Sequence, residues 1–530
     1  MNLPEHSFCP LRTIMAGTMV ALGLLGCASA PRPEPPVAAL PSSYPVAVRA
    51  QEQQEAAATV LRWDDLFPDP DLHRLLQAAL DYNSDLRASV ARVEEARASA
   101  GLQRANSLPA IGMGAQGIRS RVDLPIDQVP SGALPQPWAA MLQSVDRTQI
   151  LSTYQAGVVL TPYEIDFWGK IRQLNQAARD TYLASAEAQQ AFRTSLMALV
   201  TDTWLQGLEL QERLALAHRT LAANEESHRI MRRRAAVGLI SDMEVRQTES
   251  LVASTRADVA ALERSLAQNR ALLTQLTHLP DPPKAQGEHP LTRLADRPLP
   301  AGLPSTLLTR RPDIRAAEWQ LRAARANVAA ARAAFLPSVT LTGAGGAISD
   351  SFSNLFDHAY GAWLFVPSIH MPLFDGGRTQ AHLDLAEARR NELVAQYESS
   401  IRGAFREVSE LMAARHWLAE QEKDVRELVA AQGDRERIAL KRYDRGYNSY
   451  FEVLDAERSR FAAEQGLVQL HRARLSSLVG LYKALGGDAA IAFVSTEPAG
   501  AAPSALTASA ASASMRAAAP AATVQEGIQP

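Results

Sequence analysis

Two turns hold the residues whose types and spacing could do chemistry. Each contains a glycine, a serine three positions later and a glutamate three positions after that: Gly238, Ser241 and Glu244 in the first copy, and Gly446, Ser449 and Glu452 in the second. A glycine can adopt the left-handed conformation that ends a helix. The serine and the glutamate have the spacing of a capping box. Both copies therefore predict a helix end, a tight turn and a capped helix start.

A further carboxylate follows the second turn. Glu452 and Asp455 are three positions apart, which places them on one face of a helix. No clustered nucleophile, base or metal-ligand set accompanies them, and the 11 histidines are scattered without a His-Glu-x-x-His motif. Gly112 to Gly117 matches G-x-G-x-x-G by letter, but it lacks the strand-to-helix junction of a dinucleotide site. We therefore predict no catalytic residue, no metal and no cofactor.

Composition restricts the remaining classes of function. The 530-residue chain carries 54 basic and 57 acidic side chains, a net charge of -3, so it has no broad basic field and nucleic-acid binding is disfavoured. Both cysteines, Cys9 and Cys27, lie near the N-terminus, which excludes a disulfide framework in the body of the chain.

The N-terminal segment has the pattern of a lipoprotein leader. Arg12 precedes a short apolar stretch that ends in Leu-Leu-Gly-Cys at Cys27, a run that resembles a bacterial lipobox. The resemblance implies cleavage before Cys27 and attachment of outer membrane lipid, including palmitate, to its thiol. Ala28 rather than Asp follows, which in such lipoproteins implies the outer membrane. The alternative is an unmodified cysteine beside an apolar stretch.

Two segments have the period-two alternation of strands. In the region 109–166, Tyr154, Ala156, Val158 and Leu160 alternate with smaller or polar residues, and the region 336–374 repeats the pattern from Val339. Weak alternation over about ten residues is typical of membrane strands. An ordinary soluble hairpin is the alternative interpretation.

Most of the remaining chain has a helical composition. The stretches 169–237 and 377–445 contain no proline and are rich in Ala, Leu, Glu, Gln and Arg. Each would be about 100 Å long if continuous. A seam spaced alternately by three and four residues, running from Val394 to Val429 and broken by Arg415 and Glu422, is typical of a coiled coil.

The two halves repeat one plan. Asp85 and Pro109 recur 228 positions later as Asp313 and Pro337, and Gly238 recurs 208 positions later as Gly446. Each half is helix, β-hairpin, long helix, turn and helix, so the fold class is an α+β membrane protein. The predicted organisation is a signal peptide (1–26), a Pro-rich lipid tether (27–60), a first repeat (61–280), a linker (281–304), a second repeat (305–490) and an Ala/Ser-rich disordered tail (491–530). Two copies supply about four strands, fewer than the roughly eight of a closed membrane barrel, so we expect oligomerisation.

Several motifs in this order resemble the outer membrane factor family, the TolC-like exit ducts. They are Trp63-Asp-Asp-Leu-Phe67, Arg310-Arg-Pro-Asp-Ile-Arg315, Phe335-Leu-Pro337, Leu373-Phe-Asp-Gly-Gly-Arg378 and Tyr443-x-x-Gly446 through Val453-Leu-Asp-Ala456. The lipobox points to the NodT-type lipoprotein branch. The resemblance implies a homotrimer with a 12-stranded β-barrel in the outer membrane and a long periplasmic α-helical barrel. It also implies two partners, a periplasmic membrane-fusion adaptor and an inner-membrane RND-type pump.

The resemblance implies that the two turns are periplasmic tips, where the tunnel is closed. Glu452 and Asp455 correspond to acidic rings around the pore, which would attract cations. Tyr443 and Glu244 correspond to a pair that holds the closed state, whereas Asn448 replaces the arginine of that latch. The expected function is passive efflux of small toxic compounds, with a role in antibiotic resistance. A type I secretion duct, a non-conducting envelope scaffold and a periplasmic enzyme are the alternatives.

Overall fold

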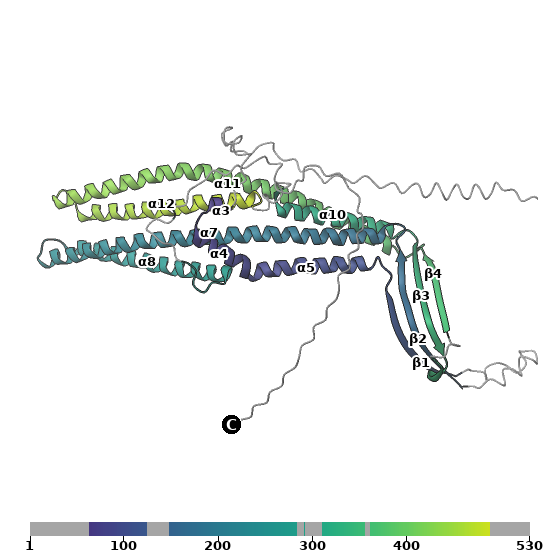
Figure 1. Ribbon diagram of the computed structural model, residues 1–530. Coiled ribbons are helices and arrows are strands. Elements are labelled where there is room, and N and C mark those ends of the chain that lie inside the picture. Colours follow the sequence, from purple (N-terminus) through teal and green to yellow (C-terminus); the bar gives the residue numbers. More distant parts are fainter. Residues whose placement is uncertain (1–62, 124–147, 284–290, 292–309, 356–360, 488–530) are drawn as a thin grey trace, which may run out of the picture.

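Long helices dominate the computed structural model, which describes residues 63–123, 148–283, 291, 310–355 and 361–487. The expected uninterrupted helices are α7 (Lys170–Ala236) and α11 (Arg378–Asp444), each of 67 residues. Both begin after a glycine with a left-handed backbone, at Gly169 and Gly377. Each turns back into a shorter antiparallel partner, α8 (Asp242–Thr277) or α12 (Tyr450–Ala484). The two helical hairpins form one long bundle (Figure 1).

A four-stranded antiparallel sheet extends from one end of this bundle (Figure 1). Its strands follow the chain in order: β1 (Ile111–Asp123), β2 (Thr148–Ile165), β3 (Ser338–Ser349) and β4 (Gly361–His370). A one-turn 3-10 helix, η5 (Phe352–Asn354), follows β3. The expected hairpins are therefore present, and β2 pairs with β3 to join them into one sheet.

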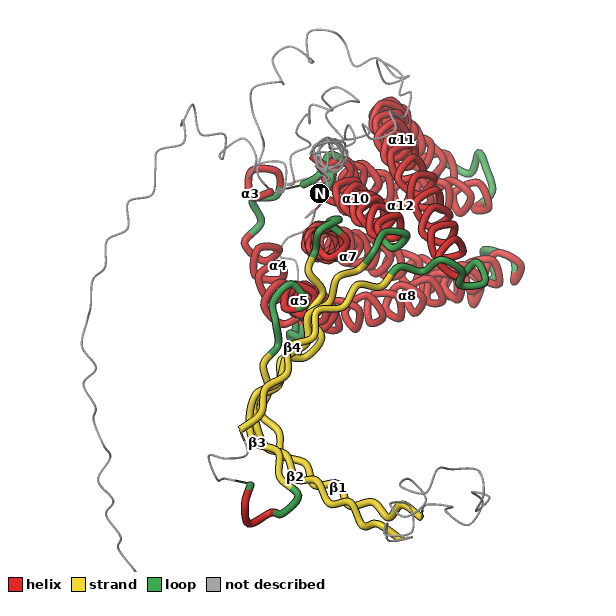
Figure 2. Tube along the Cα trace, turned by 90° about the vertical axis from the view of Figure 1, so that its right-hand side faces the viewer, coloured by secondary structure: helices red, strands yellow, loops and turns green. Residues whose placement is uncertain are grey.

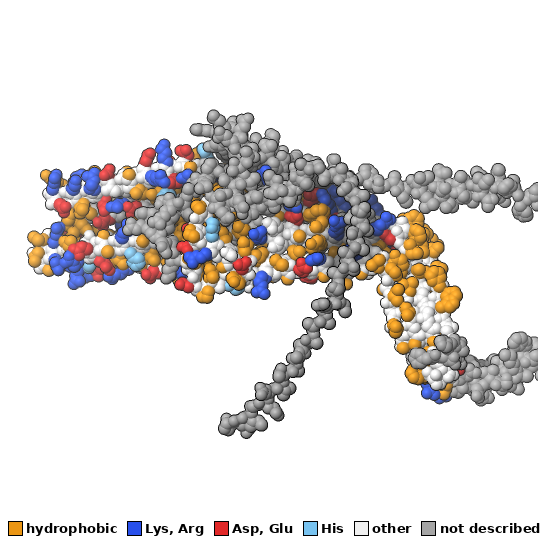
Figure 3. Space-filling view, in the orientation of Figure 1, with side chains coloured by type: hydrophobic (Ala, Val, Ile, Leu, Met, Phe, Trp, Pro, Cys, Tyr) orange, Lys and Arg blue, Asp and Glu red, His pale blue; other side chains and the backbone are white. Residues whose placement is uncertain are grey.

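Cross-strand register places large side chains beside small ones on one face of the sheet. Met113, Val158, Gly345 and Trp363 lie opposite one another in successive strands, and directly opposite residues share a face. Met113 is 87% exposed and Trp363 is 83% exposed in the single chain. Hydrophobic side chains gather over the sheet, whereas charged side chains are frequent over the helices (Figure 3). Among the helices that the structure describes, none is both long enough and apolar enough to span a membrane.

Two shorter helices pack beside the long helices at the end of the bundle next to the sheet. They are α5 (Ser84–Ala105) in the first half and α10 (Pro312–Ala333) in the second. Helix α10 packs against both α7 and α11, and α5 packs against α7. The end view shows α5, α7, α10 and α11 in succession (Figure 2). The duplicated halves therefore lie side by side rather than as separate domains.

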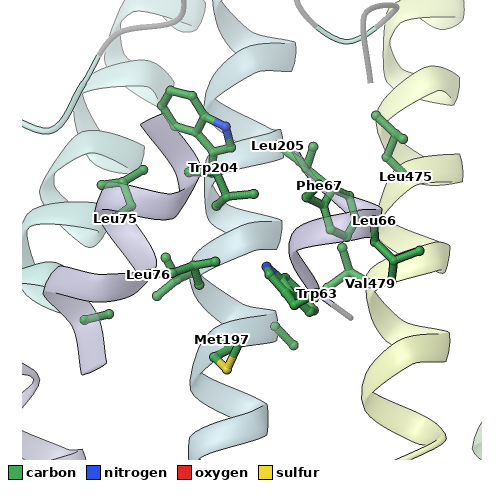
Figure 4. Packing of buried hydrophobic residues seen from close by; sticks show 14 of the residues in the cluster. Trp63, Leu66, Phe67, Leu75, Leu76, Met197, Trp204, Leu205, Leu475 and Val479 are labelled. Atoms are coloured by element: carbon green, nitrogen blue, oxygen red, sulfur yellow. The ribbon is translucent and has the colours of Figure 1, made fainter. Parts of the chain in front are cut away.

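The main hydrophobic core joins the start of the described chain to its end. The short helix α3 (Trp63–Leu66) lies between α7 and α12, and the short helix α4 (Pro70–Tyr82) packs against α7 and α8 (Figure 4). The Trp63 ring meets the Tyr482 ring edge-on, with centroids 5.0 Å apart, and Trp204 on α7 is 2% exposed. This cluster holds the middle of the bundle, and the turns lie far from it at the free ends of the hairpins.

Candidate functional site: the two helical tips

The first tip has the predicted turn and cap. Gly238 has a φ of 75°, and its N–H donates to the Ala235 carbonyl at 2.9 Å. The N–H of Leu239 donates to the Arg234 carbonyl at 3.0 Å. Such bonds satisfy carbonyls left free at a helix end. Ser241 and Glu244 then close the predicted capping box at the start of α8.

The second tip has the same turn and a different cap. Gly446 has a φ of 74°, and its N–H donates to the Tyr443 carbonyl at 2.9 Å. Ser449 is the N-cap residue of α12, but its side chain makes no capping hydrogen bond. The Glu452 carboxylate instead accepts a hydrogen bond from Asn448 Nδ2 at 2.9 Å. The predicted second capping box was therefore wrong, because the neighbouring amide competes for the glutamate.

Tyr443 connects the two hairpins. Its hydroxyl accepts a hydrogen bond from Arg234 Nη1 on α7 at 3.2 Å, and the Arg234 guanidinium carbon lies 5.8 Å from the ring centroid. The ring also lies 4.9 Å from that of Tyr450. Glu244, the expected partner of Tyr443, bonds the Ser241 N–H at 3.1 Å. Within one chain, the two residues thus have different partners.

An apolar cluster lies beneath these polar contacts. It contains residues from α7, α11 and α12, namely Met231, Ala439, Tyr450, Val453, Leu454 and Ala456. Burial raises the pKa of Tyr450 to about 12, although a hydrogen bond to Ser227 on α7 opposes the shift. The second hairpin is therefore held to α7 by packing together with the Tyr443–Arg234 bond.

The two predicted pore carboxylates have unequal surroundings. Glu452 is exposed and bonds only a neutral amide, Asn448, among the contacts of the described residues. Asp455 forms an ion pair with Arg435 on α11. Their common helical face is as expected, but Arg435 offsets the charge of Asp455. Glu452 therefore contributes more negative potential at the tip.

Glu457 on α12, a half-buried residue near this tip, was not among the predicted site residues. Burial, assisted by the charge of Glu436, raises the pKa of Glu457 to about 7. Its Oε2 atom is buried without a hydrogen-bond partner among the described residues. A signal was available, because Glu457 lies seven residues after Tyr450 and four before Phe461, at a position where a helical seam is normally apolar.

Other predictions fall outside this site. Cys27, the lipid tether and the tail lie outside the described residues. Glu422, which interrupts the predicted seam of α11, is buried and forms ion pairs with Arg426 and Arg474. In the described ranges, no three His, Cys, Asp or Glu side chains converge as metal ligands.

The duplicated bundle of long helices joined to a four-stranded sheet is the subunit plan that the resemblance to exit ducts implied. The sequence profile of the outer membrane efflux protein family matches residues 75–277 and 303–487. The chain belongs to this family, which confirms the predicted family and makes it an efflux protein rather than an enzyme.

Individual relatives are similar over most of their length. Outer membrane protein OprJ of Pseudomonas aeruginosa is 37% identical over 480 residues, which cover 89% of this chain and 95% of OprJ. The solvent efflux pump outer membrane protein SrpC of Pseudomonas putida is 39% identical over 473 residues, or 88% of this chain and 97% of SrpC. The open-state MtrE outer membrane channel of Neisseria gonorrhoeae matches with a TM-score of 0.75 and 34% identity, covering 87% of this chain and 98% of MtrE.

Proposed function

We propose that this chain is the outer membrane exit duct of a tripartite efflux pump. It passively conducts small toxic compounds or drugs from the periplasm to the outside. The relatives support this role, because SrpC is named as a solvent efflux pump protein and TtgI of Pseudomonas putida as a toluene efflux pump protein. Small-molecule efflux is therefore favoured over protein secretion.

The two unpaired edges of the sheet are the main structural support for the proposed exit duct. Within the described residues, β1 pairs only with β2 and β4 pairs only with β3, so two long edges are left. Unpaired edges bind further strands readily. Three copies supply about twelve strands, enough to close a barrel. The row containing Met113 and Trp363 would face lipid, and the helices would continue the barrel into the periplasm.

The tips are the proposed gate of this duct. In each subunit, Tyr443 and Arg234 join the second hairpin to α7, so breaking this contact would free the hairpin to move outward. Glu244 remains a candidate partner of Tyr443 across a subunit boundary. Three copies of Glu452 and Asp455 would place about six carboxylates near the pore axis, which favours cations. The turns at Gly238 and Gly446 form the tips that face the pump.

The proposed assembly has three further components: acyl chains, an adaptor and a pump. Acyl chains on Cys27, within the tether 27–60, would anchor the protein in the outer membrane. One lipid anchor binds a membrane only weakly, so the barrel supplies the second attachment. A periplasmic membrane-fusion adaptor and an inner-membrane RND-type pump would complete the path.

Planar-bilayer recording of the purified full-length protein, with crosslinking to count subunits, tests the proposal. We expect trimers and small, cation-selective openings. Trimers that never conduct, even after Tyr443 is replaced to loosen the gate, would contradict the duct and favour a non-conducting envelope scaffold. Conductance together with loss of drug export on gene deletion would separate an efflux duct from a type I secretion duct.

A further inference from the structure

The carboxyl of Glu457 occupies a core position in the seam between α12 and α7. Val453 lies four residues before it and Phe461 four residues after it, so the three side chains share one face of α12. Val453 packs with Met231 of α7 in the cluster at the tip. Phe461 packs against a second cluster that includes Leu210 and Ala217 of α7. An acidic residue thus stands between two apolar contacts with the same helix.

Neighbouring charges do not compensate this carboxyl. Helix α11 contributes Glu436, which repels a charge on Glu457 and is held by Arg460 at 3.1 Å. Arg460 also bonds Glu464 at 2.8 Å, so its guanidinium serves two other carboxylates.

The charged residues on the adjoining stretches of α7 and α8 pair with one another or are exposed. Glu225 pairs with Arg256 of α8, Glu226 pairs with Arg229, and His218 lies 3.9 Å from Glu263 of α8. Arg219 of α7 and Asp258 of α8 are exposed, and Tyr450 is a further titratable group that interacts with Glu457. A proton is therefore the simplest way to neutralise Glu457 while the seam is packed.

We propose that Glu457 is a pH-sensitive element of the tip, and that its ionisation loosens the α11–α12 hairpin from α7 on going from acidic to neutral pH. A charged carboxylate is poorly solvated in an apolar seam. Separation of the helices admits water to Oε2 and removes that cost. The proposal rests on the proposed gate at the tips and adds how that gate is regulated.

The raised pKa of Glu457 determines in which direction, and over which pH range, packing of the tip depends on pH. Burial raises the pKa of Glu457 from an ordinary 4.5 to about 7 in the packed tip, so the packed state binds the proton more tightly. Packing of α12 against α7 is therefore most stable at pH values below the ordinary pKa of 4.5. It weakens as pH rises from 4.5 to about 7 and stays weakened at higher pH. The ratio of loosened to packed tips can rise by up to about tenfold per pH unit inside the interval.

Single-channel recording of the full-length protein at several pH values tests the proposal. The wild type is expected to open more often as pH rises from about 5 to 7 and to reach a plateau above that. Glu457→Gln keeps the shape of the side chain without the charge, so its tip should remain packed and its opening should lose this rise. Glu436→Gln removes the repelling charge and should move the transition to lower pH.

A matched control and a second readout make the test decisive. Glu464→Gln lies one heptad further along α12, but Arg460 already pairs with that carboxylate, so the pH-dependent rise should persist. Hydrogen exchange in the first turns of α12, corrected for intrinsic rates, should follow the same pattern without requiring conductance. If Glu457→Gln retains the wild-type pH dependence of exchange, the inference is overturned. If hydrogen exchange responds to pH as expected but no variant conducts, the result contradicts the proposed duct and still supports the pH-sensitive contact between α12 and α7.

Discussion

Gly157 lies directly opposite Gly346 where β2 pairs with β3, the pairing that joins the duplicated hairpins. Their backbones approach closely: a Cβ on Gly346 would lie 2.2 Å from the Ala156 carbonyl oxygen, and one on Gly157 would lie 2.4 Å from that of Gly345. Backbone atoms cannot yield as a flexible side chain can. Glycine at both positions therefore permits the two halves to form one sheet.

The first prediction concerns this close approach. Gly346→Ala should force β2 and β3 apart and destabilise the folded protein by about 1–3 kcal/mol, the usual cost of overpacking. Thermal unfolding in detergent measures the effect. Gly345→Ala is the matched control, because a Cβ there meets nothing within 4 Å. Equal stability of the two variants would contradict the steric argument.

The second prediction concerns the link between the hairpins. Tyr443→Phe removes the hydroxyl that accepts from Arg234 and retains the ring that packs on Tyr450. We expect the open probability of single channels to rise about twofold to tenfold, as for loss of one hydrogen bond.

A double-mutant cycle distinguishes the two possible partners of Tyr443. Tyr443→Phe combined with Arg234→Gln should be strongly non-additive, whereas its combination with Glu244→Gln should be nearly additive. The reverse result would identify Glu244 as the partner, through a contact between subunits.

The third prediction concerns ion selectivity. Glu452→Gln should lower the preference for cations more than Asp455→Asn, because Arg435 already offsets the charge of Asp455. Arg435→Gln should raise that preference by exposing the aspartate. Reversal potentials in a potassium chloride gradient measure all three. Unchanged selectivity in every variant would contradict the proposal that both carboxylates line the pore.

The fourth prediction concerns Arg311, which joins the start of α10 to α11 and to the last residue of α12. Its side chain is 9% exposed and bonds Asp313, Glu407 and the Ala484 carbonyl. Arg311→Lys loses the planar fork and should cost on the order of 2 kcal/mol. Denaturant unfolding followed by circular dichroism measures this cost, and exposed Arg310→Lys should have little effect.

The same contact predicts a dependence on acid. Burial opposes ionisation of Asp313, but the hydrogen bonds and charge of Arg311 outweigh it and lower the pKa of Asp313 below 3.8. Its contribution to stability is present above that ordinary value and is lost as pH falls through the lowered pKa. Wild type and Asp313→Asn should therefore converge in stability only in strong acid.

The fifth prediction concerns the leader. Cys27→Ala should abolish incorporation of labelled palmitate, whereas Cys9→Ala, within the predicted signal peptide, should leave it unchanged. The body should still assemble, because the proposed barrel would provide its own attachment to the membrane. Labelling of the Cys27→Ala protein would show that the lipobox was misinterpreted.

The repeated plan and its long helices could be predicted because their causes are local. Proline-free stretches with helical composition lead to α7 and α11, and glycine after each helix permits the left-handed turn at Gly238 and Gly446. Alternation within 109–166 and 336–374 indicated the strands for the same reason. The order of the motifs then identified the family.

Partners were decided by the tertiary structure. The tip turns have the same glycine, serine and glutamate spacing, yet Glu244 caps its helix whereas Glu452 bonds Asn448. The contact between Arg234 and Tyr443 spans 209 positions.

The burial of Glu457 likewise depends on which helix lies against α12. Helical periodicity determines which residues share a face, but the docking of distant helices determines what that face meets. Sequence alone therefore predicted the elements and the tips, whereas only the packing of α7, α11 and α12 decided which side chains hold the tips and which carboxyl lies between the helices.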